Sequence, residues 1–112
     1  MGMTPVEIFK AMNGQGVKNV KEYEGLHIKP VAYHTHTYES QDGKEHTVLV
    51  IKNGEDGELY KTEVQAFIKL YMAYEEAFGT LEESEKPAII VKLVKSQKGN
   101  NYVSFDVEDL EA

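Results

Sequence analysis

Tyrosines and lysines recur on the segments of this chain that have strand-like patterns. Aromatic rings stack on bases, which contributes about 1–3 kcal/mol per base, and lysine ammonium groups contact phosphates. The candidates for this chemistry are Tyr33, Tyr38, Tyr60, Tyr102, Lys52, Lys92, Lys95 and Lys98. Tyrosine is also a good strand residue that packs across a sheet, so each ring has a structural alternative. Tyr102 is the best candidate, because Val103 and Phe105 are expected to face the core.

Two histidines, His34 and His36, are separated by one residue on a predicted strand and therefore share a face. This spacing suits a metal site, but no Asp or Glu in a matching motif completes the ligand set. Stacking of the imidazole rings on bases is the favoured interpretation. We expect neither a metal nor another cofactor.

The motifs of an enzyme are missing from the sequence. It has no Cys, no Ser-containing nucleophile elbow, no HExxH and no Gly-rich phosphate loop before a helix. These features predict a binding protein rather than a catalyst. The lack of Cys also fits a reducing compartment, so we expect a cytoplasmic location, with no secretory signal and no membrane segment.

The charge is unevenly distributed along the 112 residues. The formal net charge is −7, which argues against a protein that coats polyanions with its whole surface. Residues 86–105 nevertheless carry Lys and no acid, between two acidic segments. All 12 basic residues are Lys, so nucleic-acid contacts would favour phosphates over base identity.

Local signals predict two helices. A short helix is predicted over Pro5–Asn13, with a cap formed by Thr4, Pro5 and Glu7 and with Gly14 as the stop. Its expected apolar face is Ile8, Phe9 and Met12. Thr62 and Gln65 read as a capping box for a second helix. Its apolar stripe runs at helical spacing until Gly79.

The strand-like segments number five. The first, Leu26–Glu39, is long and changes phase at Pro30, where a bulge would fit. An Asp-Gly turn leads to the second. The others are His46–Asn53, Glu58–Lys61, Ala88–Lys95 and Tyr102–Val107, the last with Val103, Phe105 and Val107 expected to face the core.

This order predicts one mainly β domain with α-helices: a five-stranded OB-fold barrel with a helix between strands three and four and a short N-terminal helix. Residues 1–25 would be the helix and lead-in, 26–107 the barrel and 108–112 a short acidic tail. A double-stranded RNA-binding domain leaves the last two strands unexplained. A β-grasp fold has its helix after two strands instead of three.

With this order, residues 86–105 resemble the closing hairpin of the small OB-fold single-stranded DNA-binding proteins of bacteriophages. The resemblance extends over roughly residues 26–107. It implies binding of single-stranded DNA with little sequence preference, in a bacterial host cell, to protect the strand during replication or recombination. In that family the lysine-bearing loop and the following aromatic strand touch the DNA. The resemblance leaves open binding of RNA, homo-oligomers, and contacts with replication or recombination proteins.

A second reading is an acidic protein-interaction module that binds a host protein. Its support is the net charge of −7 and the Glu-rich segment 75–85. The short acidic end of the chain, which finishes in Ala112, differs from the long tail with a terminal aromatic of many bacterial relatives.

Overall fold

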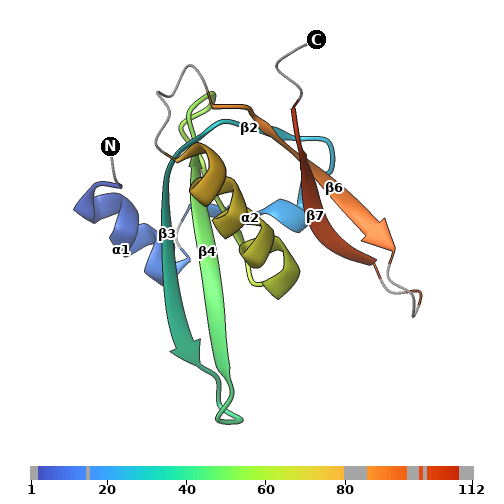
Figure 1. Cartoon of the computed structure of the whole chain (residues 1–112). Helices are drawn as coiled ribbons and strands as arrows, with labels where there is room; N and C mark the ends of the chain where they lie inside the picture. The colour runs from blue at the N-terminus through green and yellow to red at the C-terminus, as the bar shows by residue number, and fades with distance from the viewer. Residues whose placement is uncertain (1–2, 15, 80–85, 96–98, 100, 109–112) are drawn as a thin grey trace.

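A computed structural model describes residues 3–14, 16–79, 86–95, 99 and 101–108 of the chain. This part of the protein is mixed α/β and mostly strands, with seven strands in two sheets and two α-helices (Figure 1). The elements are α1 (Pro5–Asn13), β1 (Val17–Asn19), the 3₁₀-helix η1 (Val20–Glu22), β2 (His27–Ile28), β3 (Pro30–Glu39), β4 (Glu45–Asn53), β5 (Leu59–Thr62), α2 (Gln65–Phe78), β6 (Ile89–Lys95) and β7 (Asn101–Val107).

Helix α1 has the predicted bounds because its ends are defined locally. The Thr4 side chain accepts a hydrogen bond from the Glu7 N–H, Glu7 bonds back to the Thr4 N–H, and Gly14 ends the helix in the left-handed region at φ 69°. The expected apolar face is wrong, however. Ala11 is the buried residue of α1, whereas Phe9 and Met12 are 60% and 56% exposed.

The predicted first strand is divided between the two sheets. Its first part, β2, pairs with β6, and its second part, β3, pairs with β4. The register shifts between Pro30 and Ala32, so the bulge lies where the phase change predicted it. The β4–β5 turn packs on this bulge, and a methyl group at Gly54 would come within 2.6 Å of Val31 Cγ1. A larger residue there would force Val31 to shift.

Buried Asn53 holds the bend. Its Oδ1 accepts hydrogen bonds from the backbone N–H groups of Lys29 and Glu55, each at 3.0 Å, and its Nδ2 donates to the His27 carbonyl at 3.3 Å. These bonds satisfy backbone groups of β2, of the residue before Pro30 and of the β4–β5 turn, and so link the three segments at the bend. The junction between the two sheets is thereby fixed.

Helix α2 carries the predicted stripe, with Phe67, Ile68, Tyr71 and Tyr74 buried. Its predicted capping box is wrong. The helix starts at Gln65 with Val64 as N-cap, and the Thr62 hydroxyl accepts from the Val64 N–H before the helix begins. Thr62 is the last residue of β5, and its pairing with Leu49 draws it into the sheet.

The closing hairpin pairs Ile89 with Val107 through to Lys95 with Asn101. Val103 and Phe105 are buried as expected. Val107 is 41% exposed, which corrects its assignment to the core face. It is the last residue of β7 and pairs with Ile89.

The two sheets have the strand orders β1-β5-β4-β3 and β2-β6-β7. No closed barrel forms among the described residues, and β5 does not pair with β7 there. Instead β1, which the sequence did not predict, pairs in parallel with β5 and takes its edge. Beside it η1 contacts β5, β6 and β7, and its Val20 is fully buried in the main core.

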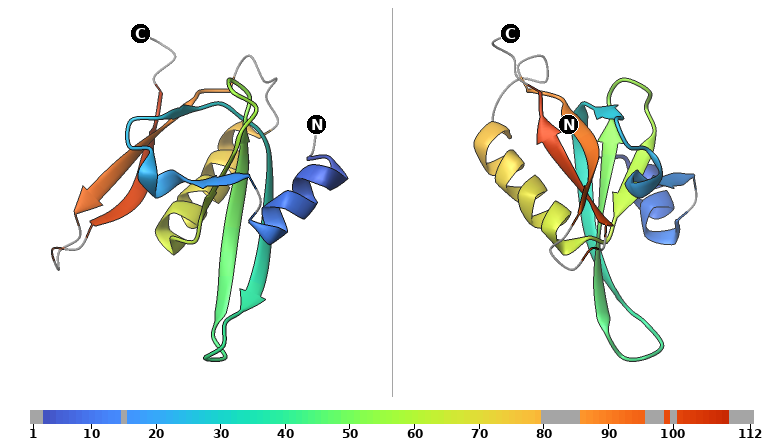
Figure 2. Two further views of the ribbon diagram at one scale, coloured as in Figure 1. Left: turned by 180° about the vertical axis from the view of Figure 1, so that it is seen from behind. Right: turned by 90° about the vertical axis from the view of Figure 1, so that its right-hand side faces the viewer.

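Helices α1 and α2 lie on opposite sides of the β3–β4 pair (Figure 2, right). Helix α2 covers the side that faces the second sheet, where the larger core cluster lies. A smaller cluster of Ala11, Val48, Val50 and Leu59 joins α1 to the other side. In the described part of the chain, neither helix has the length and apolarity needed to span a bilayer.

Candidate nucleic-acid interface

Register decides which side of the β3–β4–β5 sheet each candidate residue occupies. Tyr33, Ile51 and Tyr60 are paired across the strands and share the inner side, toward α2. His34, Val50 and Lys61 are paired in the next row and share the outer side, toward α1. The predicted site residues on this sheet therefore belong to two different surfaces.

Tyr60 cannot stack on a base, which corrects its assignment as a binding residue. It is 2% exposed, packs edge-on against Tyr23, and donates its hydroxyl proton to Asp56 Oδ2 at 2.6 Å. Burial, together with Asp56, raises its pKa. Tyr33 is 41% exposed but lies on the inner side, with its ring edge-on to Tyr71 of α2 at 5.4 Å between centroids.

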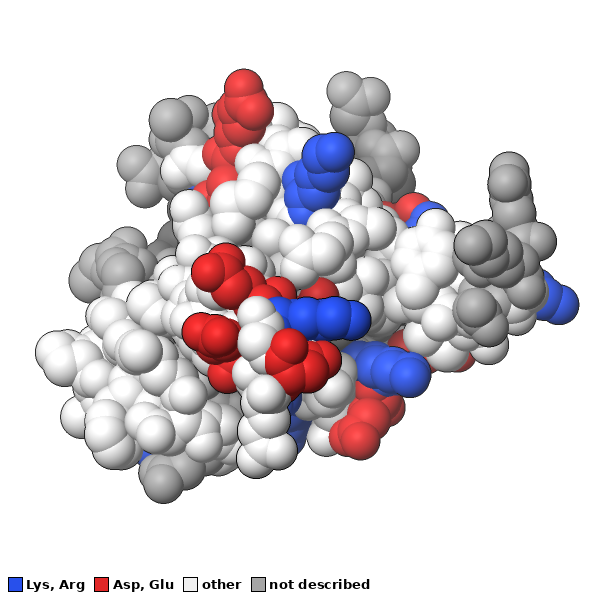
Figure 3. Space-filling view, turned by 90° about the horizontal axis from the view of Figure 1, so that it is seen from below, with Lys and Arg blue, Asp and Glu red and all other residues white. Residues whose placement is uncertain are grey.

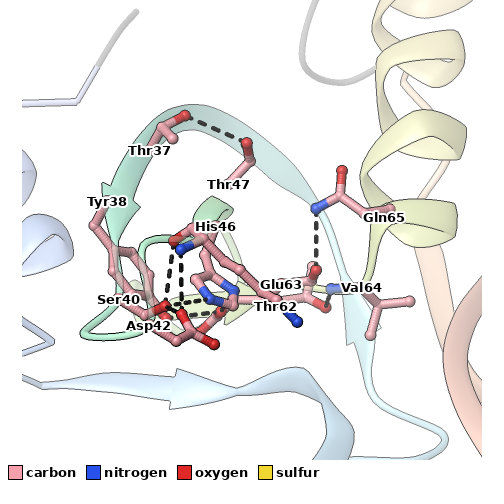
Figure 4. Close-up of polar contacts among 11 residues, drawn as sticks. Thr37, Tyr38, Ser40, Asp42, His46, Thr47, Thr62, Glu63, Val64 and Gln65 are labelled. Carbon is pink, nitrogen blue, oxygen red and sulfur yellow. Dashed lines mark hydrogen bonds and ion pairs between the residues drawn. The ribbon is translucent and has the colours of Figure 1, made fainter.

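Tyr38 lies on the outer side in a polar cluster near the end of the β3–β4 hairpin (Figure 4). Its ring stacks on His46 at 5.1 Å with an interplanar angle of 19°. Its hydroxyl donates to Glu63 Oε1 at 2.9 Å, and that bond raises the pKa of Tyr38. His46 Nδ1 is 3.7 Å from the same oxygen, and Nε2 is 3.2 Å from Ser40 Oγ. The cluster fixes the orientation of an exposed aromatic ring.

His34 and His36 follow on the same side of β3. Their rings stack at 5.7 Å, and neither His34 Nε2 nor His36 Nδ1, both buried, has a hydrogen-bond partner within the described structure. Burial lowers the pKa of His36, and the neighbouring His34 and Lys61 add to this against the opposing effect of Glu63. Over the described ranges, no three His, Asp or Glu side chains are grouped to hold a metal ion.

Two adjoining hollows run across the end of β5. One, of about 310 Å³, lies between the C-terminal end of α1 and the sheet, and His36, Tyr38 and Val48 line it. The other, of about 250 Å³, lies at the seam between the sheets and is lined by Asn19, Lys21 and Val103. Lys61 and Glu63 line both hollows, so the two adjoin at these residues, and we call the pair of hollows the β5 groove.

The lysines of this groove differ from those that the sequence singled out. Lys52 is 2.7 Å from Glu7, and Lys92 is 2.6 Å from Asp106, so each of these predicted phosphate contacts already faces an acid. Within the described residues, no carboxylate lies within 4.0 Å of the ammonium of Lys21 or Lys61. Because successive side chains of a strand point to opposite faces, a buried Tyr60 would have predicted that Lys61 faces outward. Lys21 could not be found, because η1 was not predicted.

The closing hairpin carries a separate part of the predicted site. Tyr102 is half-buried opposite Val94, and Lys95 is exposed opposite Asn101. Lys98 lies outside the described residues. Seen from the end of the β3–β4 hairpin, basic and acidic side chains are intermixed near the middle of the molecule (Figure 3). This face therefore has no broad basic surface in the described part of the chain, and a phosphate would meet single lysines there.

The chain matches no family model, no curated protein sequence and no solved structure.

Proposed function

We propose that this protein binds single-stranded DNA in the β5 groove with little sequence preference and so protects the strand during replication or recombination. The observation that carries the proposal is the groove itself, which combines Lys21 and Lys61 with the oriented ring of Tyr38. Single-strand binding without sequence preference needs this combination of cations and stacking surfaces.

The proposal includes an open OB-like architecture. Three meandering strands, β3 to β5, are followed by α2 and then by the β6–β7 hairpin, and β2 continues β3 into the second sheet. This is the element order of an OB-fold. In this interpretation, β1 and η1 fill the seam between β5 and β7, and the groove crosses the outer face of the third OB strand.

The chemistry of the groove favours backbone contacts over base readout. Lysine is a point charge with rotatable donors, so it contacts a phosphate without fixing a base edge. Glu63 lines both hollows of the groove, so its carboxylate limits how many phosphates can enter. A shallow salt dependence and weak sequence preference follow, and RNA would meet the same contacts.

The test is fluorescence anisotropy of labelled oligo(dT) with wild type and two double variants of equal charge. Lys21→Ala with Lys61→Ala should weaken binding roughly tenfold or more at low salt, since about 0.7 counterions are released per phosphate. Lys10→Ala with Lys69→Ala removes two exposed lysines from the helices and should leave the affinity near that of wild type.

Equal losses in the two double variants would show that only net charge matters, and the groove assignment would fail. If wild type does not bind micromolar oligo(dT) at low salt, the proposed function is wrong. The remaining hypothesis would then be that the chain is an acidic module that binds a host protein.

A further inference from the structure

We propose that α1 is an intramolecular competitor: it covers the outer side of the β3–β4–β5 sheet and must move aside for a nucleic-acid strand to extend along that side. This inference rests on the proposed function, because it concerns the surface that continues the β5 groove.

The position of α1 is the first support. Ala11 shares a buried cluster with Val48 and Val50 of β4 and Leu59 of β5, on the same side of the sheet as the candidate binding residues His36 and Lys61. Met12, Asn13 and Gly14 form one wall of the groove, opposite His36 and Tyr38. The helix therefore ends where the proposed ligand site begins.

The apolar contact of α1 is small. Ala11 is the one buried residue of the helix, while Val6, Phe9 and Met12 are more than half exposed. A helix held by so little buried apolar area belongs to the part of a protein that opens most readily. Gly14 and Gly16, with φ 69° and 66°, lie where α1 connects to β1 and accept backbone changes at low cost.

The main polar contact of α1 resembles a phosphate contact. Glu7 Oε2 lies 2.7 Å from Lys52 Nζ, and this ion pair lowers the pKa of Glu7. The Glu7 carboxylate is paired with the Lys52 ammonium, which a phosphate on this side of the sheet would otherwise contact. Glu7 and a nucleic-acid strand would therefore compete for Lys52.

The histidines supply an independent observation. His34 Nε2 and His36 Nδ1 are buried with no hydrogen-bond partner among the described residues. Such atoms carry a desolvation cost when nothing pairs with them. A ligand with donors or acceptors along this side would remove that cost, whereas the docked α1 does not.

The first experiment uses the full chain and a charge-matched pair of variants. Glu7→Gln should tighten oligo(dT) binding roughly fivefold or more, which is the lower end of the affinity changes usually produced by coupling between two sites. Glu24→Gln, an exposed acid outside the groove and α1, is the control for the same change in net charge. In a Lys52→Ala background, the gain from Glu7→Gln should vanish.

The second experiment locks the helix. The chain has no cysteine, so Glu7→Cys with Lys52→Cys can be joined specifically by a short bis-methanethiosulfonate cross-linker, which releases methanesulfinate at each thiol and is cleaved by a reductant. The linked protein should bind oligo(dT) roughly tenfold more weakly than the same protein after cleavage. On saturation with oligo(dT), the amides of wild-type α1 should also exchange faster with deuterium.

Equal binding by the linked and cleaved forms, with α1 exchange unchanged in wild type, would overturn the competitor role while leaving the proposed function intact. Absence of oligo(dT) binding by wild type and by the cleaved form would overturn both.

Discussion

At the residue scale, the tyrosines of strands β3 and β5 have different roles. Tyr60 is a core side chain whose hydroxyl is bonded to Asp56, and Tyr33 packs against α2. Tyr38 is exposed on the outer side, and its orientation is set by His46 and Glu63. Of these three rings, Tyr38 is the one whose placement suits stacking on a base.

Truncation of Tyr38 should therefore affect binding more than folding. Tyr38→Ala should cost about 1–3 kcal/mol of oligo(dT) binding free energy, because the stacking ring is lost. Tyr38→Phe keeps the ring, removes the bond to Glu63 and should retain most of the affinity. Anisotropy gives the affinity, and the melting temperature reports folding. The same measurements on Tyr102→Ala test the hairpin. If the Tyr38→Ala protein binds oligo(dT) with the wild-type affinity, the Tyr38 ring does not stack on a base.

His36 makes the stability of the fold depend on pH. Its folded-state pKa lies below the ordinary value of 6.5, first because of burial and then because of His34. Between the two values the unfolded chain binds more protons, so the free energy of unfolding rises with pH. The contribution of His36 is present above about pH 6.5 and is lost as the pH falls through the lowered pKa.

We expect His36→Gln to reduce the loss of melting temperature between pH 7.5 and pH 5.5 relative to wild type. Thermal melts followed by circular dichroism at the two pH values give the comparison. His27→Gln, at an exposed position on β2, controls for loss of an imidazole. An unchanged pH dependence in His36→Gln would mean that other groups dominate the acid sensitivity.

At the element scale, the segment between α1 and β2 joins the two sheets. β1 adds to the edge of β5, and η1 inserts Val20 into the core that α2, β6 and β7 also line. This placement substitutes for direct pairing of β5 with β7 in the described structure. The segment is thus a structural part of the domain as well as a connection.

Val20→Ala should lower the free energy of unfolding by about 1–3 kcal/mol, from lost burial and the cavity that remains. Val6→Ala removes the same atoms from an exposed position on α1 and should change stability by less than about 0.5 kcal/mol. Urea unfolding measures both. Similar values for the two variants would contradict a seam held by η1.

At the scale of the whole molecule, the net charge of −7 opposes any polyanion outside the groove. A strand held by about two to four phosphate contacts predicts a log–log salt slope of roughly −1.4 to −3 for oligo(dT). Duplex DNA, whose bases cannot reach Tyr38, should bind far more weakly. Titrations of both ligands at several salt concentrations check this, and a slope steeper than about −5 would imply a wider cationic surface.

Much of the fold could be predicted from the sequence because its signals are local. The bounds of α1 follow from its cap and from Gly14, and the bend near Pro30 follows from a phase change in the pattern of apolar residues. The stripe of α2 and the alternation of Val103 with Tyr102 likewise need only neighbouring residues. Periodicity and caps act over a few positions, so they can be read without the tertiary structure.

Tertiary contacts decided the rest. Three residues beginning at Val17 became a strand because β5 offered an edge, and Val20 was buried because two sheets meet around it. Lys52 met Glu7, which is far away in the sequence, while Lys21 and Lys61 came together at one groove. Ion pairing and burial depend on which distant segments meet in space, and local patterns carry no information about that.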